Sequence, residues 1–203
     1  MYSCLEDVAL DVEKMEGVSM KERIWEYLYD SYLELPIWVY EGLLAVLCIG
    51  AVVSFVRLGA RKGCRVTLRL LLTEYVVMIF CTTVFFRSVM AVRQYDFHPF
   101  WSYGAIQSGE SPQLLVENIM NVVVFVPVGI ILGSLLRVKG SWFIALLFGL
   151  GISVSIETLQ FFLKRGFAEV DDVMHNTVGC VIGFMLVVII KQIWLLQKRY
   201  WMS

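Results

Sequence analysis

Acidic and amide side chains interrupt the apolar stretches in the second half of this chain. Ser153, Glu157 and Gln160 are spaced i, i+4 and i+7, which places them on one stripe of a helix. Asp172 and Asn176 are one helical turn apart in the next apolar stretch. Such groups can bind a cation or a hydrogen-bonding group, and a carboxylate can also act as a general base. Because ionisable groups are costly among apolar ones, this pattern indicates a functional site.

The stretches that carry these residues are long and apolar enough to cross a membrane. Of the 203 residues 59% are hydrophobic and 17% are charged, and the mean hydropathy is +0.72. Soluble proteins are about 45–50% apolar, whereas a bilayer demands about 20 consecutive apolar residues in a helix. Five stretches meet or nearly meet this demand: Ile37–Val56, Leu70–Phe86, Ile119–Leu136, Ser141–Leu163 and Val173–Ile190.

The sequence therefore predicts an all-α, multi-pass bundle of about five transmembrane helices over residues 37–203, with membrane lipids as partners. Residues 1–36 carry nine acids and three bases before any apolar run, so we expect an acidic tail and not a cleaved signal peptide. Ser19 and Glu22 in this tail have capping-box spacing, which predicts an amphipathic helix on the membrane surface. Lys+Arg 17 against Asp+Glu 18 disfavours a nucleic-acid partner.

The basic residues predict an orientation in the cell membrane. Short loops rich in Lys and Arg stay in the cytoplasm, and the expected loop Arg57–Arg69 holds five of them. With this loop inside, ten bases lie on the inner side and seven on the outer side. The N-terminus is then outside and the C-terminus is cytoplasmic.

Connectivity predicts that the polar residues meet at one membrane face, whatever the orientation. Odd-numbered spans begin on the face where even-numbered spans end. Asn121 near the start of span three, Glu157 near the end of span four and Arg87 at the end of span two therefore share one leaflet with Asp172. With the orientation above, this is the outer leaflet, where we expect a polar cavity between spans three, four and five.

Four further residues have expected structural roles. Pro127 removes a backbone donor and, with Gly129, loosens the helix of span three. Gly179 and Gly183 form a small-xxx-small pair that lets a neighbouring helix approach closely.

Three segments together resemble the VanZ-like membrane proteins. They are ENIMNVVVFVPVG from residue 117, SVSIETLQ from residue 153 and RGFAEVDDVMHNTVGCVIG from residue 165, and the resemblance covers about residues 87–190. Two positions depart from the family pattern, since Glu169 stands for an Asp and DFHPF from residue 96 stands for N-L-x-P-F. The family is named for a membrane protein associated with low-level resistance to the glycopeptide teicoplanin.

Together with this resemblance, the polar pattern suggests a binding site for a lipid-linked cell-wall precursor or an amphiphilic glycopeptide, and the resemblance implies a role in low-level teicoplanin resistance. Its candidate residues are Asn121, Glu157, Gln160, Arg165, Asp171, Asp172 and Asn176. We favour a non-catalytic binding protein. The alternative is an intramembrane enzyme with Glu157 as general base and the pair Asp171 and Asp172 positioning a water, metal or substrate, in which Glu157 and Asp172 are the candidate catalytic residues. A structural subunit, whose polar cluster serves a partner, is a third reading.

Simpler interpretations stand beside these. Asn121, Gln160 and Asn176 can be interhelical hydrogen-bond partners, worth about 0.6 kcal/mol each, and Asp171 and Asp172 can cap a helix N-terminus. Other motifs give no support for a cofactor or a metal. No glycine-rich phosphate loop is visible, and Glu157, the Asp pair and His175 lack diagnostic metal-ligand spacing.

Overall fold

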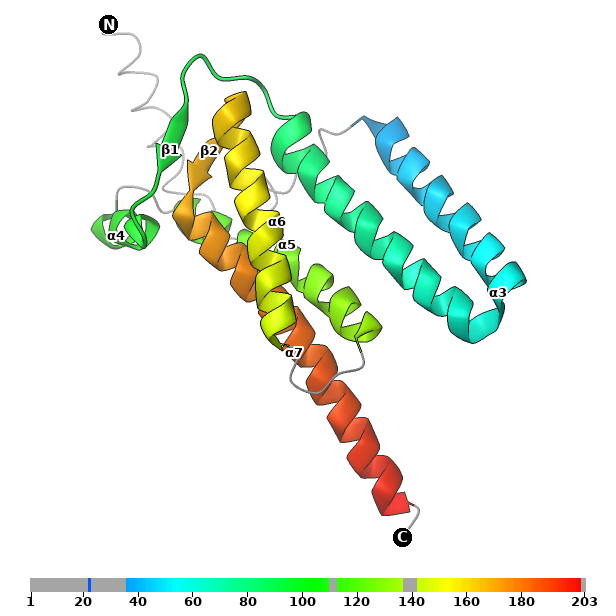
Figure 1. Ribbon diagram of the computed structural model, residues 1–203. Coiled ribbons are helices and arrows are strands. Elements are labelled where there is room, and N and C mark those ends of the chain that lie inside the picture. Colours follow the sequence, from blue (N-terminus) through cyan, green and yellow to red (C-terminus); the bar gives the residue numbers. More distant parts are fainter. Residues whose placement is uncertain (1–21, 23–35, 110–112, 137–141, 202–203) are drawn as a thin grey trace, which may run out of the picture. The chain divides into compact units, whose positions relative to one another are not determined.

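The computed structural model describes Glu22 and residues 36–109, 113–136 and 142–201. The chain divides into two units, Met1–Glu34 and Leu35–Ser203, and all elements discussed below belong to the second. The expected acidic tail and surface helix of residues 1–36 lie outside the described residues, except for Glu22 and Pro36. The described elements follow in the order α3 (Ile37–Phe80), η2 (Cys81–Phe85), β1 (Gln94–Asp96), α4 (Trp101–Ser108), α5 (Gln113–Leu135), α6 (Trp142–Leu163), β2 (Phe167–Glu169) and α7 (Val170–Trp201) (Figure 1).

Four helical segments of the described chain are long and apolar enough to cross a membrane: α3 with η2, α5, α6 and α7. The predicted all-α, multi-pass membrane bundle is thereby confirmed. In the most apolar window of each, no more than 39% of the residues are buried inside the protein. Such exposure is expected of helices whose outward faces meet lipid and not water.

The first two predicted spans form a helical hairpin, and the segment between them is helical where a loop was predicted. The helix α3 runs from Ile37 to Phe80 and is interrupted only at Gly59, whose φ of 72° suits glycine. Figure 1 shows its two arms side by side, and they pack closely where Gly63 meets the backbone of Phe55. The expected loop Arg57–Arg69 is therefore helical apart from Gly59. Long basic side chains can reach the headgroup layer from a helix end, so their presence did not require a loop.

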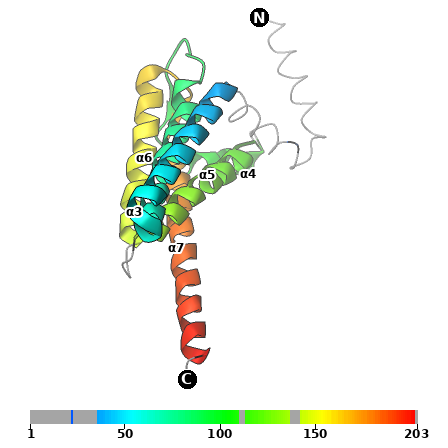
Figure 2. The same cartoon turned by 90° about the vertical axis from the view of Figure 1, so that its right-hand side faces the viewer.

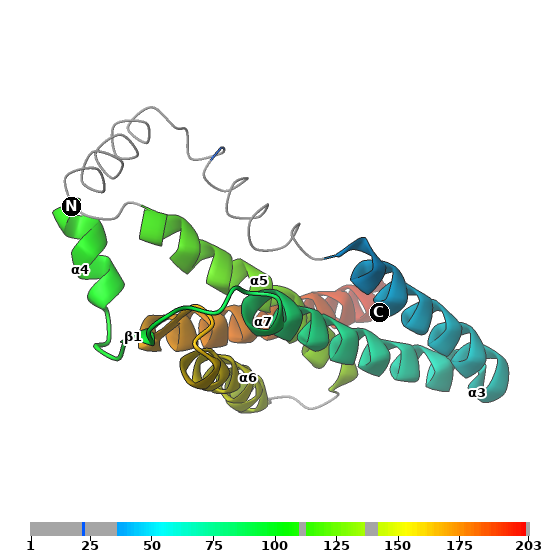
Figure 3. The same cartoon turned by 90° about the horizontal axis from the view of Figure 1, so that it is seen from above.

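The closest helix packing joins α5 to α7. A Cβ added to Gly179 or Gly183 would overlap the carbonyl of Val122 or Val126 on α5, and one added to Gly129 would overlap the backbone of Cys180. Seen from above, α7 runs between α5 and α6 (Figure 3). The three glycines therefore allow the backbones of α5 and α7 to touch.

Buried side chains from α3, η2, α5, α6 and α7 form a core beneath this contact. Its members are Ile79, Val84, Phe125, Val128, Leu132, Ala145, Ile156, Cys180 and Phe184. Pro127 lies within α5, and the Tyr75 hydroxyl donates to the nearby Val124 carbonyl at 3.0 Å. This bond ties the second arm of α3 to α5 three residues before Pro127.

Residues 86–109, here called the connector, lie between η2 and α5. The connector has structure that the sequence pattern did not predict. Its strand β1 pairs in parallel with β2, which lies between α6 and α7, and Tyr95 is opposite Ala168. The connector then forms the short helix α4. The pairing draws the connector over the ends of the spanning helices.

The last helix continues well past its predicted end at Ile190. It runs to Trp201, and every residue from Ile189 to Trp201 is exposed. Figure 2 shows this part of α7 extending beyond α5 and α6. At about 1.5 Å per residue, a helix of 32 residues is longer than the hydrocarbon layer is thick.

We expect Gly183→Ala to lower the free energy of unfolding in detergent by about 1–3 kcal/mol, because the added methyl group would force α5 and α7 apart. Gly151→Ala is the matched control, since an added Cβ at Gly151 meets nothing within 4 Å; alanine also favours the helix there. Thermal unfolding of the purified variants measures both effects. Equal stability of the two variants would contradict close packing at Gly183.

Candidate functional site

Four acidic side chains gather at one end of α5, α6 and α7. They are Glu117 on α5, Glu157 on α6, Glu169 on β2 and Asp172 on α7, here called the acid cluster. The Glu157 carboxylate accepts a hydrogen bond from the Glu169 backbone N–H at 2.9 Å. Asp172 is close enough to repel both Glu157 and Glu169 electrostatically, and Glu117 repels Asp172. The arrangement concentrates negative charge near one membrane surface.

Arg87 is the cation that faces the acid cluster. Its guanidinium is close enough to attract Glu117, Glu157 and Asp172. The side chain lies against Gly166, whose φ of 93° and missing Cβ leave room for it. Connectivity predicted Arg87 at this membrane face, but Arg87 was not among the predicted binding residues.

Arg165, one of the predicted binding residues, points elsewhere. Its Nη1 donates to the carbonyls of Val84 and Phe85 at the end of η2. The side chain thus holds the end of the second span. The two arginines cannot be told apart by residue type alone, because both lie at the same membrane face.

The amide side chains of the predicted site connect different helices. Asn121 donates to Asp172 at 2.6 Å, linking α5 to α7. Asn176 donates to Ser153 at 2.9 Å, one helical turn deeper, linking α7 to α6. Gln160 donates to the Thr83 carbonyl at 3.0 Å, linking α6 to η2. Asn121 therefore joins the acid cluster directly, while the other two amides brace the helices around it.

Two of these amides have unused acceptors. Gln160 Oε1 and Asn176 Oδ1 are buried and accept no hydrogen bond from the described part of the chain. A buried acceptor without a donor costs about 1–3 kcal/mol. Both positions therefore favour a water molecule or a ligand group that donates a hydrogen bond.

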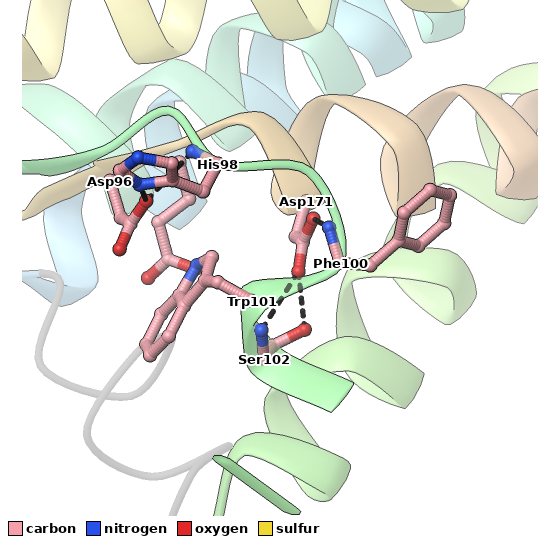
Figure 4. A network of polar contacts seen from close by, with 7 residues as sticks. Asp96, His98, Phe100, Trp101, Ser102 and Asp171 are labelled. Atoms are coloured by element: carbon pink, nitrogen blue, oxygen red, sulfur yellow. Dashed lines mark hydrogen bonds and ion pairs between the residues drawn. The ribbon is translucent and has the colours of Figure 1, made fainter. Parts of the chain in front are cut away.

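Asp171 has a role different from that of its neighbour Asp172. It is fully buried, and one of its oxygens accepts from the Phe100 N–H at 2.6 Å. The other accepts from the Ser102 N–H at 3.1 Å and the Ser102 hydroxyl at 2.5 Å (Figure 4). Asn118 donates in turn to the Ser102 hydroxyl at 3.1 Å. Asp171 thus fixes the connector to α7 and uses both oxygens in doing so.

The connector also supplies aromatic partners to this region. Trp101 Nε1 donates to Glu169 at 3.0 Å, and the Tyr103 hydroxyl lies 2.7 Å from His175 Nε2. Neither contact was predicted from the sequence. Among the residues that the structure describes, no group of three or more His, Cys, Asp or Glu side chains is arranged to hold a metal ion.

Burial raises the pKa of Glu169 from its ordinary value of 4.5 to about 8. The Asp172 carboxylate adds to this effect, and the hydrogen bond from Trp101 opposes it. Glu169 therefore carries a proton at neutral pH in the folded protein. The acid cluster relieves part of its charge repulsion in this way.

The sequence of this chain matches a known protein family. A model of the VanZ/LLP1 family matches residues 72–191, which is more than half of the chain. The match covers the second arm of α3 from Leu72 onward and nearly all of the remaining described elements up to Lys191. No significant match was found among curated proteins or among solved structures.

The stability of the protein should fall as the pH rises from about 4.5 to about 8. The folded state holds the Glu169 proton up to about pH 8, whereas the unfolded chain releases it near pH 4.5. The stabilisation is full below pH 4.5 and is lost as the pH passes through 8. Glu169→Gln should flatten this dependence in unfolding measurements, and Asp96→Asn, which changes an acid outside the cluster, should not. An unchanged slope in Glu169→Gln would contradict the proposed protonation.

Asp171→Asn should loosen the connector, because an amide group would face N–H donors that now meet a carboxylate. Hydrogen bonds to a charged group are worth about 1.5–3 kcal/mol each. We expect faster proteolytic cleavage within residues 87–109 and a smaller effect from Ser102→Ala, which leaves both backbone hydrogen bonds to Asp171 in place. Cleavage of Asp171→Asn at the rate of the unchanged protein would contradict the role of Asp171 in fixing the connector to α7.

Proposed function

Because the chain belongs to the VanZ/LLP1 family and crosses the membrane several times, we propose that it binds the polar head of an amphiphile at the acid cluster. The excess of acids carries this proposal. The cluster has four acidic side chains, and Arg87 is close enough to attract three of them, so acidic groups outnumber the cation that faces them. Charges gathered in a poorly hydrated place favour a partner of opposite sign. The preferred head group is therefore cationic or rich in hydrogen-bond donors.

The position of the cluster supports an amphiphile over a soluble cation. Glu157 lies six residues before the end of α6, which at 1.5 Å per residue is about 9 Å from that end. A head group could reach this depth while its acyl chain lies along the exposed faces of the helices. The buried acceptors of Gln160 and Asn176 could receive donors from the same head group.

We further propose that the ligand is a lipid-linked cell-wall precursor or an amphiphilic glycopeptide of the teicoplanin type, bound from the outer leaflet. Each combines apolar chains with a polar head, as the site requires. Binding of such a molecule at the cell membrane would account for low-level glycopeptide resistance. In this proposal Asp172, Glu157 and Asn121 contact the head group, whereas Asp171 and Arg165 position the surrounding chain.

The proposal predicts that Glu157→Gln and Asp172→Asn each weaken teicoplanin binding by about tenfold or more. Removing one partner of a buried charge pair costs about 2 kcal/mol or more. Isothermal titration of the purified full chain in detergent measures the affinity. Asp96→Asn is the matched control, because Asp96 lies outside the acid cluster and pairs with His98.

The outcomes separate the candidate functions. Weakened binding in both cluster variants with an unchanged control supports an amphiphile-binding protein. Turnover of a lipid-linked precursor that is lost in Glu157→Gln, while binding is retained, would favour the intramembrane enzyme with Glu157 as general base. Unchanged binding in both variants and no turnover would refute both functions for this site.

A further inference from the structure

A second polar surface lies at the same end of the bundle, outside the acid cluster. It consists of Arg93, Lys164, Tyr95, Phe97 and Phe161, here called the basic–aromatic rim. The Arg93 guanidinium lies 5.5 Å from the centre of the Phe161 ring. Tyr95 stacks on Phe97 at 5.1 Å and meets Phe161 edge-on at 5.3 Å. The connector and α6 thus build one continuous surface.

Lys164 completes this surface from the end of α6. It directly follows α6, whose last turn carries Phe161. Its backbone carbonyl accepts from the Met90 N–H at 2.8 Å, and its Nζ lies 3.4 Å from the Ala91 carbonyl. These contacts bring the lysine to the part of the connector that carries Arg93.

The backbone at Lys164 is unusual for a residue with a side chain. Its φ is 55°, and the Arg165 N–H donates to the Gln160 carbonyl at 3.0 Å. Together these mark a Schellman motif with Lys164 at the position that glycine usually holds. A left-handed conformation is unfavourable for a lysine, because its Cβ crowds the backbone. Glycine would end the helix at lower cost. The need to end the helix therefore does not explain why a lysine occupies this position.

The charges of the rim are not neutralised within the described part of the chain. No acid there lies within ion-pair distance of Arg93 or Lys164. Asp96, the acid closest to Arg93 in the sequence, accepts hydrogen bonds from the backbone and ring of His98. Arg93 lies above an aromatic ring, and Lys164 supplies a second cation at the adjoining end of a spanning helix. Together they have the chemistry that recognises a phosphate group at a membrane surface.

From this geometry we propose that the basic–aromatic rim binds the phosphate of a membrane phospholipid head group. The end of α6 favours a lipid as the source of the phosphate, because Phe162 and Leu163 are exposed beside Lys164 and can contact acyl chains. Arg93 and Lys164 hold the phosphate oxygens, and the aromatic rings support the glycerol region. The proposal does not depend on what the acid cluster binds.

The test uses the purified full chain in detergent, titrated with phosphatidylglycerol and followed by native mass spectrometry. Arg93→Gln with Lys164→Gly should weaken lipid binding about 25-fold, which is about fivefold for each lost cation. Lys164→Gly should at the same time keep or raise the thermal stability, because glycine suits the left-handed position. Diacylglycerol, which lacks phosphate, should bind equally to the variant and the unchanged protein.

Lys198→Gln with Arg199→Gln is the matched control. It removes two cations from the other end of α7, one of them stacked on Trp194 at 5.4 Å. If this control weakens phosphatidylglycerol binding as much as the rim variant does, the effect is general surface electrostatics and the proposal is overturned. An unaffected rim variant overturns it as well.

Inorganic phosphate distinguishes the two sources of the ligand. When phosphatidylglycerol binding depends on the rim and survives a large excess of inorganic phosphate, the rim recognises the intact lipid, as proposed. Displacement of the lipid by inorganic phosphate would instead assign the rim to soluble phosphate and overturn the choice of a lipid. The proposed function is tested separately, through teicoplanin binding by the acid-cluster variants. A negative result with the rim variants would therefore leave that test unaffected.

Discussion

The close contact between α5 and α7 is the constraint on which the rest of the structure depends. Gly179 and Gly183 remove the side chains that would otherwise separate the two backbones. This close packing fixes the position of α5 along α7, and at that position Asn121 donates a hydrogen bond to Asp172 at 2.6 Å. One helical turn further along α7, Asn176 donates to Ser153 on α6. Packing of small residues deep in the bundle thereby determines which polar groups meet at its end.

The site is also built by the segments between the spans. Asp171 holds the connector through Phe100 and Ser102, and β1 pairs with β2 next to Glu169. Acids are tolerated here because the ends of spanning helices are near water and head groups, whereas the bilayer centre would penalise them. The acid cluster and the basic–aromatic rim place acidic and basic side chains at the same end of the bundle. The two surfaces therefore favour ligands of opposite charge.

Sequence patterns predicted the elements better than the contacts between them. Hydropathy located the apolar helices, and connectivity placed Glu157, Asp172 and Asn121 at one face. The pairing of β1 with β2 left no signal, because each strand has three residues and its partner is distant in the chain. Residue type also could not show that Asp171 serves the connector or that Arg87, in place of Arg165, faces the acids. Those assignments depend on tertiary packing.

The central claim is that polar groups from separate spanning helices meet at one end of the bundle, and cysteine cross-linking in native membranes tests it most directly. Asn121→Cys with Asp172→Cys, in a chain whose own cysteines are replaced by serine, should be joined within one molecule by mild oxidation or by a short bifunctional thiol reagent. The two native side chains are in hydrogen-bond contact at 2.6 Å, so thiols at these positions lie close enough for such a link. Failure of this pair to cross-link in the folded protein would contradict the account.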